Sequence, residues 1–440
     1  MMKFKETTQD LLDFIKSSAS MFHAVDEISK RLEDKGFIYL AEQEKWEMEK
    51  GGKYYTTRNN SSIVAWHIGE DLSDYHFQMT SAHTDSPTFK VKAEAELDGP
   101  ENYLRLNTEA YGGMIDSSWF DRPLGLAGRV FVKENDKIVS KLINIDKDIL
   151  MIPNVAIHLN RDINKGYSYN KQIDLLPILS AGELKKGAYK HLLAKELGLE
   201  EDQILSADLF LVNRQRQAIW GVEDEFVSSP KLDNLQSTYV TLMAFLESSN
   251  PKAINVYTSF DNEEVGSGTK QGALSTLLKD SLMRINTGLG FELEDYHQAV
   301  AKSFMVSCDN AHALHPNHPD MYDKNNRSYL NKGLVIKEAA NQKYTTDAFS
   351  RAVFESLCDQ AQVPYQRFAN RSDKPGGSTL GNLSNQQVSL HAIDVGLPQL
   401  AMHSAYETGG AKDSLYAIEA FKAYFSTNLK IEGADKIKLG

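Results

Sequence analysis

The feature that most constrains the fold of this chain is a regular alternation of strand-like and helix-like segments after about residue 231. Short continuous apolar runs are typical of buried strands, and apolar residues three or four positions apart are typical of helices. The expected strands lie at 253–260, 304–308 and 389–395, and the expected helices at 232–246, 273–278, 346–362 and 412–429. Such alternation predicts an α/β fold, in which a parallel or mixed sheet is covered by helices on both faces.

The start of the chain belongs to the same pattern, but a β-rich stretch separates it from the rest. The elements expected before residue 222 are helices within 9–34 and near 188–198, strands at 76–82 and 207–212, and a hairpin at 126–145. We therefore expect an α/β domain made of residues 1–95 and 222–440, interrupted by a β-rich insertion at 96–221. The chain length of 440 residues is enough for two or three domains of about 150 residues each.

Charge and cysteine content exclude several classes of protein. The 48 Lys and Arg against 60 Asp and Glu leave a net charge of −12, which argues against nucleic-acid or membrane-surface partners because these need clustered basic residues. Cys308 and Cys358 are too few for a disulfide framework, so we expect reduced thiols. The first residues carry no secretory signal, and no apolar run approaches the roughly 18 residues of a membrane span. We expect a cytoplasmic protein.

Four polar clusters each lie at or just beyond the end of an apolar run. They are His83-Thr84-Asp85, Asp261-Asn262-Glu263-Glu264, Ser307-Cys308-Asp309-Asn310 and Ala401-Met402-His403-Ser404. A fifth cluster, Lys231-Leu232-Asp233-Asn234, opens a helix after Pro230. Ligand-binding and catalytic residues gather at strand ends in open α/β sheets, so these clusters are the candidate functional site.

The adjacent carboxylates Glu263 and Glu264 are the most informative of these residues. A lone Asp or His has an ordinary structural interpretation, as a helix cap, a turn residue or a hydrogen-bonded polar side chain. Two carboxylates directly after a buried strand repel each other and lose solvation, so they need a compensating cation. The clusters together offer the oxygen and imidazole ligands that Zn²⁺, Mn²⁺ or Co²⁺ accept. They indicate a dinuclear hydrolytic site without thiolate ligands.

Three other motifs suggest competing chemistries. His312, His315 and His318 recur every three residues, but intervening prolines prevent a single helix from carrying them, so we favour supporting roles over a metal-binding loop. The stretch Gly266-Ser267-Gly268-Thr269-Lys270 lacks the first glycine of a phosphate-binding loop. A Ser–His–Asp triad is conceivable, although the chain has no Gly-x-Ser-x-Gly elbow.

Several longer stretches match a known family. The most specific are Ser81-Ala82-His83-Thr84-Asp85-Ser86-Pro87, Asp261-Asn262-Glu263-Glu264-Val265-Gly266-Ser267 and Ala311-His312-Ala313-Leu314-His315-Pro316-Asn317. In the insertion, Trp119-Phe120-Asp121-Arg122 and Ala156-Ile157-His158-Leu159-Asn160-Arg161 add to the match. Through these motifs, almost the whole chain resembles the aspartyl aminopeptidase family of dinuclear zinc exopeptidases. The resemblance implies a mixed-sheet exopeptidase domain covered by helices and interrupted by a β-rich dimerisation domain.

The resemblance also implies roles for individual residues. The implied metal ligands are His83 and Asp309 for one ion, Glu264 and His403 for the other, and Asp233 as the bridge between them. Glu263 would be the general base, and Asp85 would orient His83. The three ligand carboxylates and Glu263 carry four negative charges, which two divalent ions would balance. Zinc is the expected metal, with manganese or cobalt as alternatives.

Assembly and substrate contacts follow from the same resemblance. Members of the family dimerise through the insertion and form closed dodecamers, in which the histidine that matches His158 reaches into the neighbouring subunit's site. Lys337 would contact the acidic side chain of the substrate. This sequence departs from the usual pattern at Gly376, often a cysteine, and at Tyr406, where many members carry arginine. The second departure leaves the strictness of an Asp/Glu preference open.

These observations predict a cytoplasmic, homo-oligomeric, zinc-dependent aminopeptidase. It would remove N-terminal residues, with a preference for Asp or Glu, from short peptides. One alternative is an aminopeptidase of neutral or broad specificity, and another is a metal-stabilised assembly or cargo particle with incidental catalysis. The presence of Glu263 beside a full ligand set favours an enzyme, because a scaffold would not need a general base.

Overall fold

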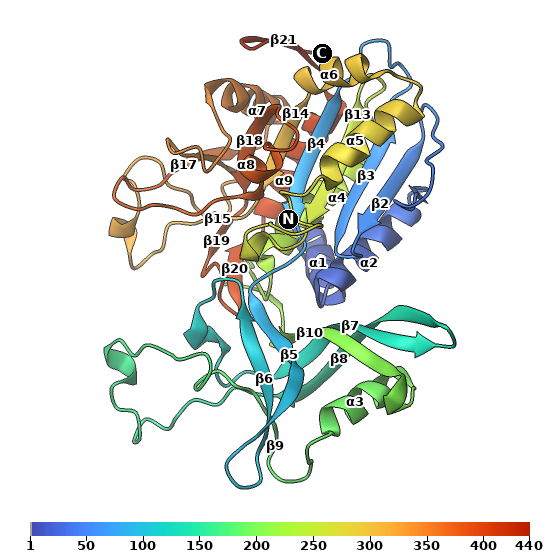
Figure 1. Cartoon of the computed structure of the whole chain (residues 1–440). Coiled ribbons are helices and arrows are strands. Elements are labelled where there is room, and N and C mark those ends of the chain that lie inside the picture. Colours follow the sequence, from blue (N-terminus) through green and yellow to red (C-terminus); the bar gives the residue numbers. More distant parts are fainter. Residues whose placement is uncertain (1) are drawn as a thin grey trace.

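The computed structural model describes residues 2–440 and is built around a nine-stranded mixed sheet (Figure 1). In spatial order its strands are β1 (Ile38–Tyr39), β2 (Lys53–Arg58), β3 (Ser62–Ile68), β13 (Ile254–Phe260), β4 (Phe77–His83), β14 (Phe304–Cys308), β18 (His391–Gly396), β16 (Leu334–Glu338) and β17 (Tyr365–Ala369). The central strands β13, β4, β14 and β18 are parallel, whereas β3 and β16 pair with this group in the antiparallel direction. The carboxyl ends of the parallel strands therefore meet at one edge.

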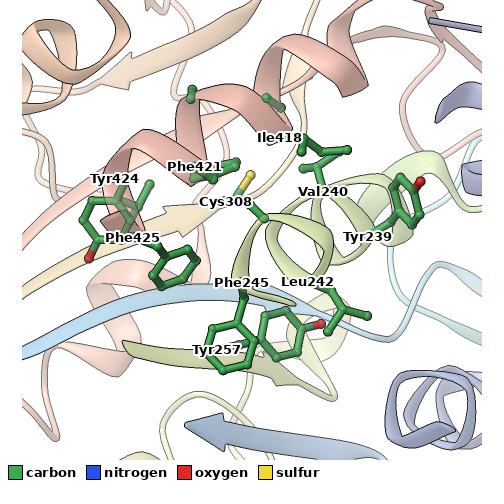
Figure 2. Packing of buried hydrophobic residues seen from close by; sticks show 14 of the residues in the cluster. Tyr239, Val240, Leu242, Phe245, Tyr257, Cys308, Ile418, Phe421, Tyr424 and Phe425 are labelled. Carbon is green, nitrogen blue, oxygen red and sulfur yellow. The ribbon is translucent and has the colours of Figure 1, made fainter. Parts of the chain in front are cut away.

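Helices cover both faces of this sheet. One face packs against α1 (Met2–Ser17), α2 (Met21–Glu33), α4 (Leu232–Leu246), α7 (Ala348–Ala361) and α9 (Asp413–Ser426), and the other against α5 (Leu277–Gly288), α6 (Leu293–Ala301) and α8 (Leu380–Ser384). Successive strand residues point to opposite faces, so Tyr257 belongs to the first core and Val256 to the second. Figure 2 shows the first core, where the ring of Phe245 lies 5.9 Å from Tyr257 and 5.6 Å from Phe425, centroid to centroid. The predicted α/β class is confirmed.

A second, six-stranded antiparallel sheet lies below the first in Figure 1. Its strands, in spatial order, are β8 (Lys137–Leu150), β7 (Leu124–Glu134), β10 (Ile204–Asn213), β5 (Thr88–Asp98), β6 (Leu104–Tyr111) and β9 (Ile178–Ser180). Helix α3 (Ala188–Leu197) packs on this sheet and shares a separate hydrophobic core with it. The expected hairpin is β7–β8, whose strands pair from Glu134 opposite Lys137.

Two smaller sheets and several short helices complete the described structure. A five-stranded sheet contains β11 (Ala218–Trp220), β12 (Phe226–Ser229), β20 (Glu407–Gly410), β19 (Pro398–Leu400) and β15 (Ala311–His312), and β21 (Leu429–Gly433) pairs with β22 (Lys436–Leu439). The 3₁₀ helices are η1 (Asp116–Trp119), η2 (Ile163–Lys165), η3 (Glu201–Gln203), η4 (Glu263–Val265) and η5 (Pro319–Met321). Within residues 2–440, no helix has the length and apolar character needed to cross a membrane.

One expected element is misplaced. The segment 273–278 is mostly a turn, and α5 starts only at Leu277. Ser275 explains the delay, because its N–H donates to the carbonyl of Gly272 while its hydroxyl accepts the N–H of Leu277. Such local bonds compete with helical ones.

Candidate metal centre

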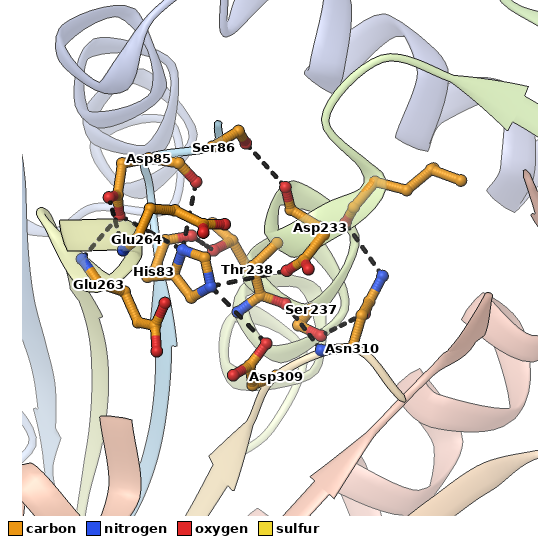
Figure 3. A network of polar contacts seen from close by, with 12 residues as sticks. His83, Asp85, Ser86, Asp233, Ser237, Thr238, Glu263, Glu264, Asp309 and Asn310 are labelled. Atoms are coloured by element: carbon orange, nitrogen blue, oxygen red, sulfur yellow. Dashed lines mark hydrogen bonds and ion pairs between the residues drawn. The ribbon is translucent and has the colours of Figure 1, made fainter. Parts of the chain in front are cut away.

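Five imidazole and carboxylate side chains meet at the carboxyl edge of the central strands. Figure 3 shows four of them, His83, Asp233, Glu264 and Asp309. The contributing positions are the last residue of β4 (His83), the start of α4 (Asp233), the 3₁₀ turn after β13 (Glu264), the residue after β14 (Asp309) and the loop between β19 and β20 (His403). Because β4, β13 and β14 are parallel neighbours, their ends place three of these side chains together.

The carboxylate of Asp233 lies between two histidines. His83 Nε2 is 3.6 Å from Asp233 Oδ1 and 3.6 Å from Asp309 Oδ1. On the other side, His403 Nε2 is 3.4 Å from Asp233 Oδ2 and 3.4 Å from Glu264 Oε2. The site is therefore two histidine–carboxylate groups that share Asp233, each oxygen of which faces one group.

Two buried oxygens in this cluster have no hydrogen-bond partner among the described residues, namely Asp233 Oδ1 and Glu264 Oε1. Ligand atoms of His83, Asp233 and Glu264 also lie within 4.8 Å of one another. Buried carboxylate oxygens normally find a donor or a cation. Oxygen and imidazole donors without thiolates suit Zn²⁺, Mn²⁺ or Co²⁺, so this cluster fits divalent metal ions.

The electrostatics of the cluster also favour a cation. Burial and the charge of Asp233 raise the pKa of Glu264 well above its usual range, despite the opposing effect of His83. Burial likewise raises the pKa of Glu263 to about 8. The charge of His83 opposes this rise, and the charge of Asp309 adds to it. Burial opposes protonation of His403, but the bond to Asp233 raises the pKa of its imidazole to about 9. Protons thus occupy positions where divalent ions would compete with them.

Asp85 supports this cluster from behind. Its Oδ1 is 3.3 Å from His83 Nδ1, so it can hold the ring with Nε2 pointing into the site. The same carboxylate accepts the backbone N–H groups of Glu263 and Glu264, each at 3.2 Å. It also accepts the hydroxyl of Tyr111, the last residue of β6, at 2.7 Å. One buried carboxylate therefore connects a histidine, the Glu263–Glu264 turn and the second sheet.

A cavity of about 300 Å³ opens in front of the cluster. Glu263 and Lys337 line it together with the five candidate ligands. The Lys337 ammonium, on β16, donates to the backbone carbonyl of Asp309 at 2.7 Å and lies 5.3 Å from the Tyr344 ring centroid. Burial disfavours its charge, but Asp309, together with Tyr344, Asp394 and Cys308, outweighs this effect and raises the pKa of Lys337. A cation thus sits beside the candidate metal ligands.

Of the other residues singled out in the sequence, some line the cavity and others lie outside it. His312 lines the cavity, whereas His315 and His318 are not among its lining residues. His158 is exposed in the segment between β8 and β9 and does not line the cavity of its own chain. Tyr406 also lies outside it and donates its hydroxyl to the carbonyl of Arg216 at 2.5 Å.

Comparison with known proteins identifies the family. Residues 14–425 match the family described as "Aminopeptidase I zinc metalloprotease (M18)". The chain belongs to the M18 family of aminopeptidases. The predicted family is therefore confirmed, since aspartyl aminopeptidases are M18 enzymes. Membership makes this M18 protein a metallo-aminopeptidase of the hydrolase class.

Relatives and solved structures cover nearly all of this M18 chain. It is 47% identical over 423 residues to a probable M18 family aminopeptidase 2 from Clostridium novyi, covering 95% of this chain and 98% of the relative. A structure described as the Ape4 and Nbr1 complex aligns with a TM-score of 0.93 at 36% identity, over 96% of this chain and 86% of that one. The mApe1 dodecamer of S. cerevisiae aligns with a TM-score of 0.84 at 27% identity, over 96% and 97%.

Two residues that contact the site were not predicted from the sequence, Tyr111 and Glu407. Tyr111 reaches Asp85 from the second sheet, and Glu407 accepts the backbone N–H of Asp233 at 3.0 Å. Neither residue stands in a motif with metal-ligand spacing. Their contacts are to positions far away in the chain, so only the folded structure reveals them.

Proposed function

We propose that this M18 aminopeptidase uses two metal ions to hydrolyse the N-terminal peptide bond of short peptides with an acidic first residue. The observation that carries the proposal is the Asp233 carboxylate, whose two oxygens face two separate histidine–carboxylate groups. A carboxylate shared between two half-sites is suited to bridging a pair of ions.

The proposed ligands are those that the sequence predicted. His83 and Asp309 would hold one ion, Glu264 and His403 the other, and Asp233 both. Zinc is the proposed metal, and manganese and cobalt accept the same donors. When bound, the ions would supply Lewis acidity toward water and the peptide carbonyl.

In the proposed reaction, Glu263 would transfer the proton from the attacking water to the leaving amine, and Asp85 would hold Glu263 in position. Glu263 lines the cavity but makes none of the histidine contacts that join the other carboxylates. Its carboxylate would take a proton from the attacking water and deliver it to the leaving amine. Asp85 holds the Glu263 backbone and the His83 ring, which keeps base and ligand in a fixed relation.

Preference for an acidic first residue rests on Lys337. Its buried ammonium faces the cavity and can offer a remaining N–H to a substrate carboxylate. Tyr406 stands where many relatives carry arginine, but its hydroxyl is bonded to Arg216 outside the cavity. The proposed acidic preference therefore rests on Lys337 and not on the residue at position 406.

We propose a cytoplasmic homo-oligomer of dimers that form a dodecamer. In this proposal, residues 1–95 and 222–440 form the catalytic domain and residues 96–221 the dimerisation domain, with His158 reaching into a neighbouring site. The segment that carries His158 exposes Val155, Ile157 and Leu159 at 56%, 49% and 83%. Such an apolar surface is typical of a contact between subunits, and the S. cerevisiae relative is a dodecamer.

A panel of peptides tests the proposed reaction. The purified protein is assayed for release of the first residue from peptides that begin with Asp, Glu, Ala or Leu, with and without a chelator. We expect chelator-sensitive release that is fastest from Asp and Glu. Equal rates for all four would favour broad specificity, and release that is absent or insensitive to the chelator would favour a scaffold.

A further inference from the structure

Glu407 is a buried carboxylate that the reaction scheme does not use. It lies in β20 with 1% of its surface exposed. Its Oε2 accepts the backbone N–H of Asp233 at 3.0 Å, and its Oε1 accepts the backbone N–H of His403 at 2.7 Å. One side chain thus holds the backbone of the shared carboxylate ligand and of one histidine ligand, which belong to segments far apart in the sequence.

The hydrogen bonds of Glu407 extend through Gln399 to the segment that carries a third proposed ligand, Asp309. Gln399 donates its Nε2 to Glu407 Oε1 at 3.3 Å and accepts Asn310 Nδ2 on its own Oε1 at 2.8 Å. Asn310 follows Asp309 in the chain, and its N–H donates to Asn234 Oδ1 at 3.2 Å. Gln399 and Asn310 are both buried. A continuous buried network therefore joins the backbone at Asp233 and His403 to Asn310, the residue after Asp309.

The chemistry of these contacts requires a carboxylate at position 407. Every group that approaches Glu407 through a hydrogen bond is an N–H donor. A carboxylate offers only acceptors, whereas a glutamine offers an NH₂ group on one side. Glutamine would therefore place a donor against the N–H of either Asp233 or His403 and would release that contact. An unpaired buried donor costs about 1–3 kcal/mol.

We propose that Glu407 is a positioning residue that fixes the spacing between Asp233 and His403 and thereby sets the affinity and geometry of the metal pair. This inference rests on the proposed dinuclear centre. Groups that orient metal ligands typically change metal affinity by about 10–100-fold when they are removed. The expected signature is thus a loss of metal affinity beyond any loss of stability.

Asp413 provides a matched control for Glu407. It is also 1% exposed, and its carboxylate accepts the backbone N–H groups of Asn331 at 2.7 Å and Gly333 at 2.9 Å. It lies at the start of α9 and does not line the catalytic cavity. Asp413→Asn removes the same kind of interaction as Glu407→Gln, but it should affect folding alone.

The test compares wild type, Glu407→Gln and Asp413→Asn after metal removal. Each protein is titrated with zinc in competition with a chromophoric chelator, and each is loaded with Co²⁺ for an absorption spectrum. We expect the wild type to bind two ions and Glu407→Gln to bind at least one of them with a Kd raised about 10–100-fold. The Co²⁺ spectrum should change in Glu407→Gln and stay as in wild type in Asp413→Asn.

Wild-type affinity and an unchanged Co²⁺ spectrum in Glu407→Gln would overturn the proposal, as would an equal loss in Asp413→Asn. If Glu407→Gln does not fold, Gln399→Met is measured in the same way, because it cuts the link to Asn310 and leaves Glu407 in place. We expect a smaller loss of affinity from it, and wild-type values would overturn the proposal. A wild type that binds no zinc would instead refute the dinuclear centre itself.

Discussion

Glu263 and Glu264 are neighbours in the chain, yet their side chains have different surroundings. Glu264 Oε2 lies 3.4 Å from His403 Nε2, whereas Glu263 lines the cavity without such a histidine contact. We expect Glu263→Gln to keep both metal ions and lose about 10²–10⁴-fold in kcat, because a carboxamide cannot accept the proton. Glu264→Gln is the contrasting variant and should lose metal. Metal content and kcat measured on the same samples check both outcomes, and substantial turnover by Glu263→Gln would refute its role as base.

In the proposed function, the single charge of Lys337 sets the preference for an acidic first residue. Its ammonium is buried and donates to the backbone carbonyls of Asp309 at 2.7 Å and Asn310 at 3.4 Å, which leaves one N–H for a substrate. We expect Lys337→Met to lower kcat/KM for peptides beginning with Asp by about 10–100-fold, because a hydrogen bond to a charged group contributes about 1.5–3 kcal/mol. Peptides beginning with Ala serve as the internal control and should change little. An equal loss for both would mean that Lys337 supports only Asp309.

The proposed metal ligands could be predicted from the sequence more readily than the residues that hold them in place. His83 and Asp309 stand directly at the ends of apolar strands, so their position alone makes them candidates. Glu407 gives no such signal, since its partner Asp233 is 174 positions away and the contact is to a backbone N–H. Lys337 and His158 were named only through the family resemblance, because a lone basic residue has no diagnostic spacing.

At the scale of elements, the buried parallel strands in the middle of the large sheet could be predicted from the sequence, whereas the strands at its β1 end could not. β13 and β14 are mostly apolar and are buried along their whole length, because helices cover both of their faces. By contrast the edge strand β1 is only two residues long and exposed, and β2 beside it has the mixed sequence Lys-Tyr-Tyr-Thr-Thr-Arg, so neither gives an apolar run of ordinary strand length. Edge strands bury less surface, so their sequences are under weaker constraint from the core.

The end of β6 connects the second sheet to the edge of the first sheet that carries the candidate metal centre. Tyr111 donates its hydroxyl to Asp85 Oδ2 at 2.7 Å and accepts Asn262 Nδ2 at 2.8 Å. We expect Tyr111→Phe to lower kcat by about tenfold, because Asp85 loses a donor that helps to fix its orientation. The loss of stability should be about 1 kcal/mol.

Tyr239→Phe is the matched control for that variant. The Tyr239 hydroxyl also donates to a carboxylate at 2.7 Å, that of Asp10 on α1, and it does not line the catalytic cavity. A urea unfolding curve and kcat are measured for both proteins. We expect similar losses of stability and a loss of kcat only in Tyr111→Phe. A similar fall in kcat in both variants would show that the hydroxyl of Tyr111 contributes only to general stability.

For the whole molecule, we expect the proposed metal centre to govern how stability depends on pH. Without metal, burial raises the pKa of Glu263 to about 8, and contact with Asp233 raises that of His403 to about 9 despite burial. Between the ordinary pKa values of these groups and the raised ones, the folded protein retains protons that the unfolded chain has released. The free energy of unfolding of the metal-free protein must then fall as pH rises through this range.

Metal reverses this dependence, because its ligands bind it in their deprotonated forms and protons compete with it at low pH. We expect the unfolding free energy of the chelator-treated protein to fall from pH 5.5 to 8.5 by on the order of a few kcal/mol, and that of the zinc-loaded protein to rise over the same interval. Thermal unfolding at matched ionic strength, with zinc or with chelator, measures both slopes. Parallel slopes would mean that these protons and the metal do not occupy the same site, and the charge balance proposed for the centre would be wrong.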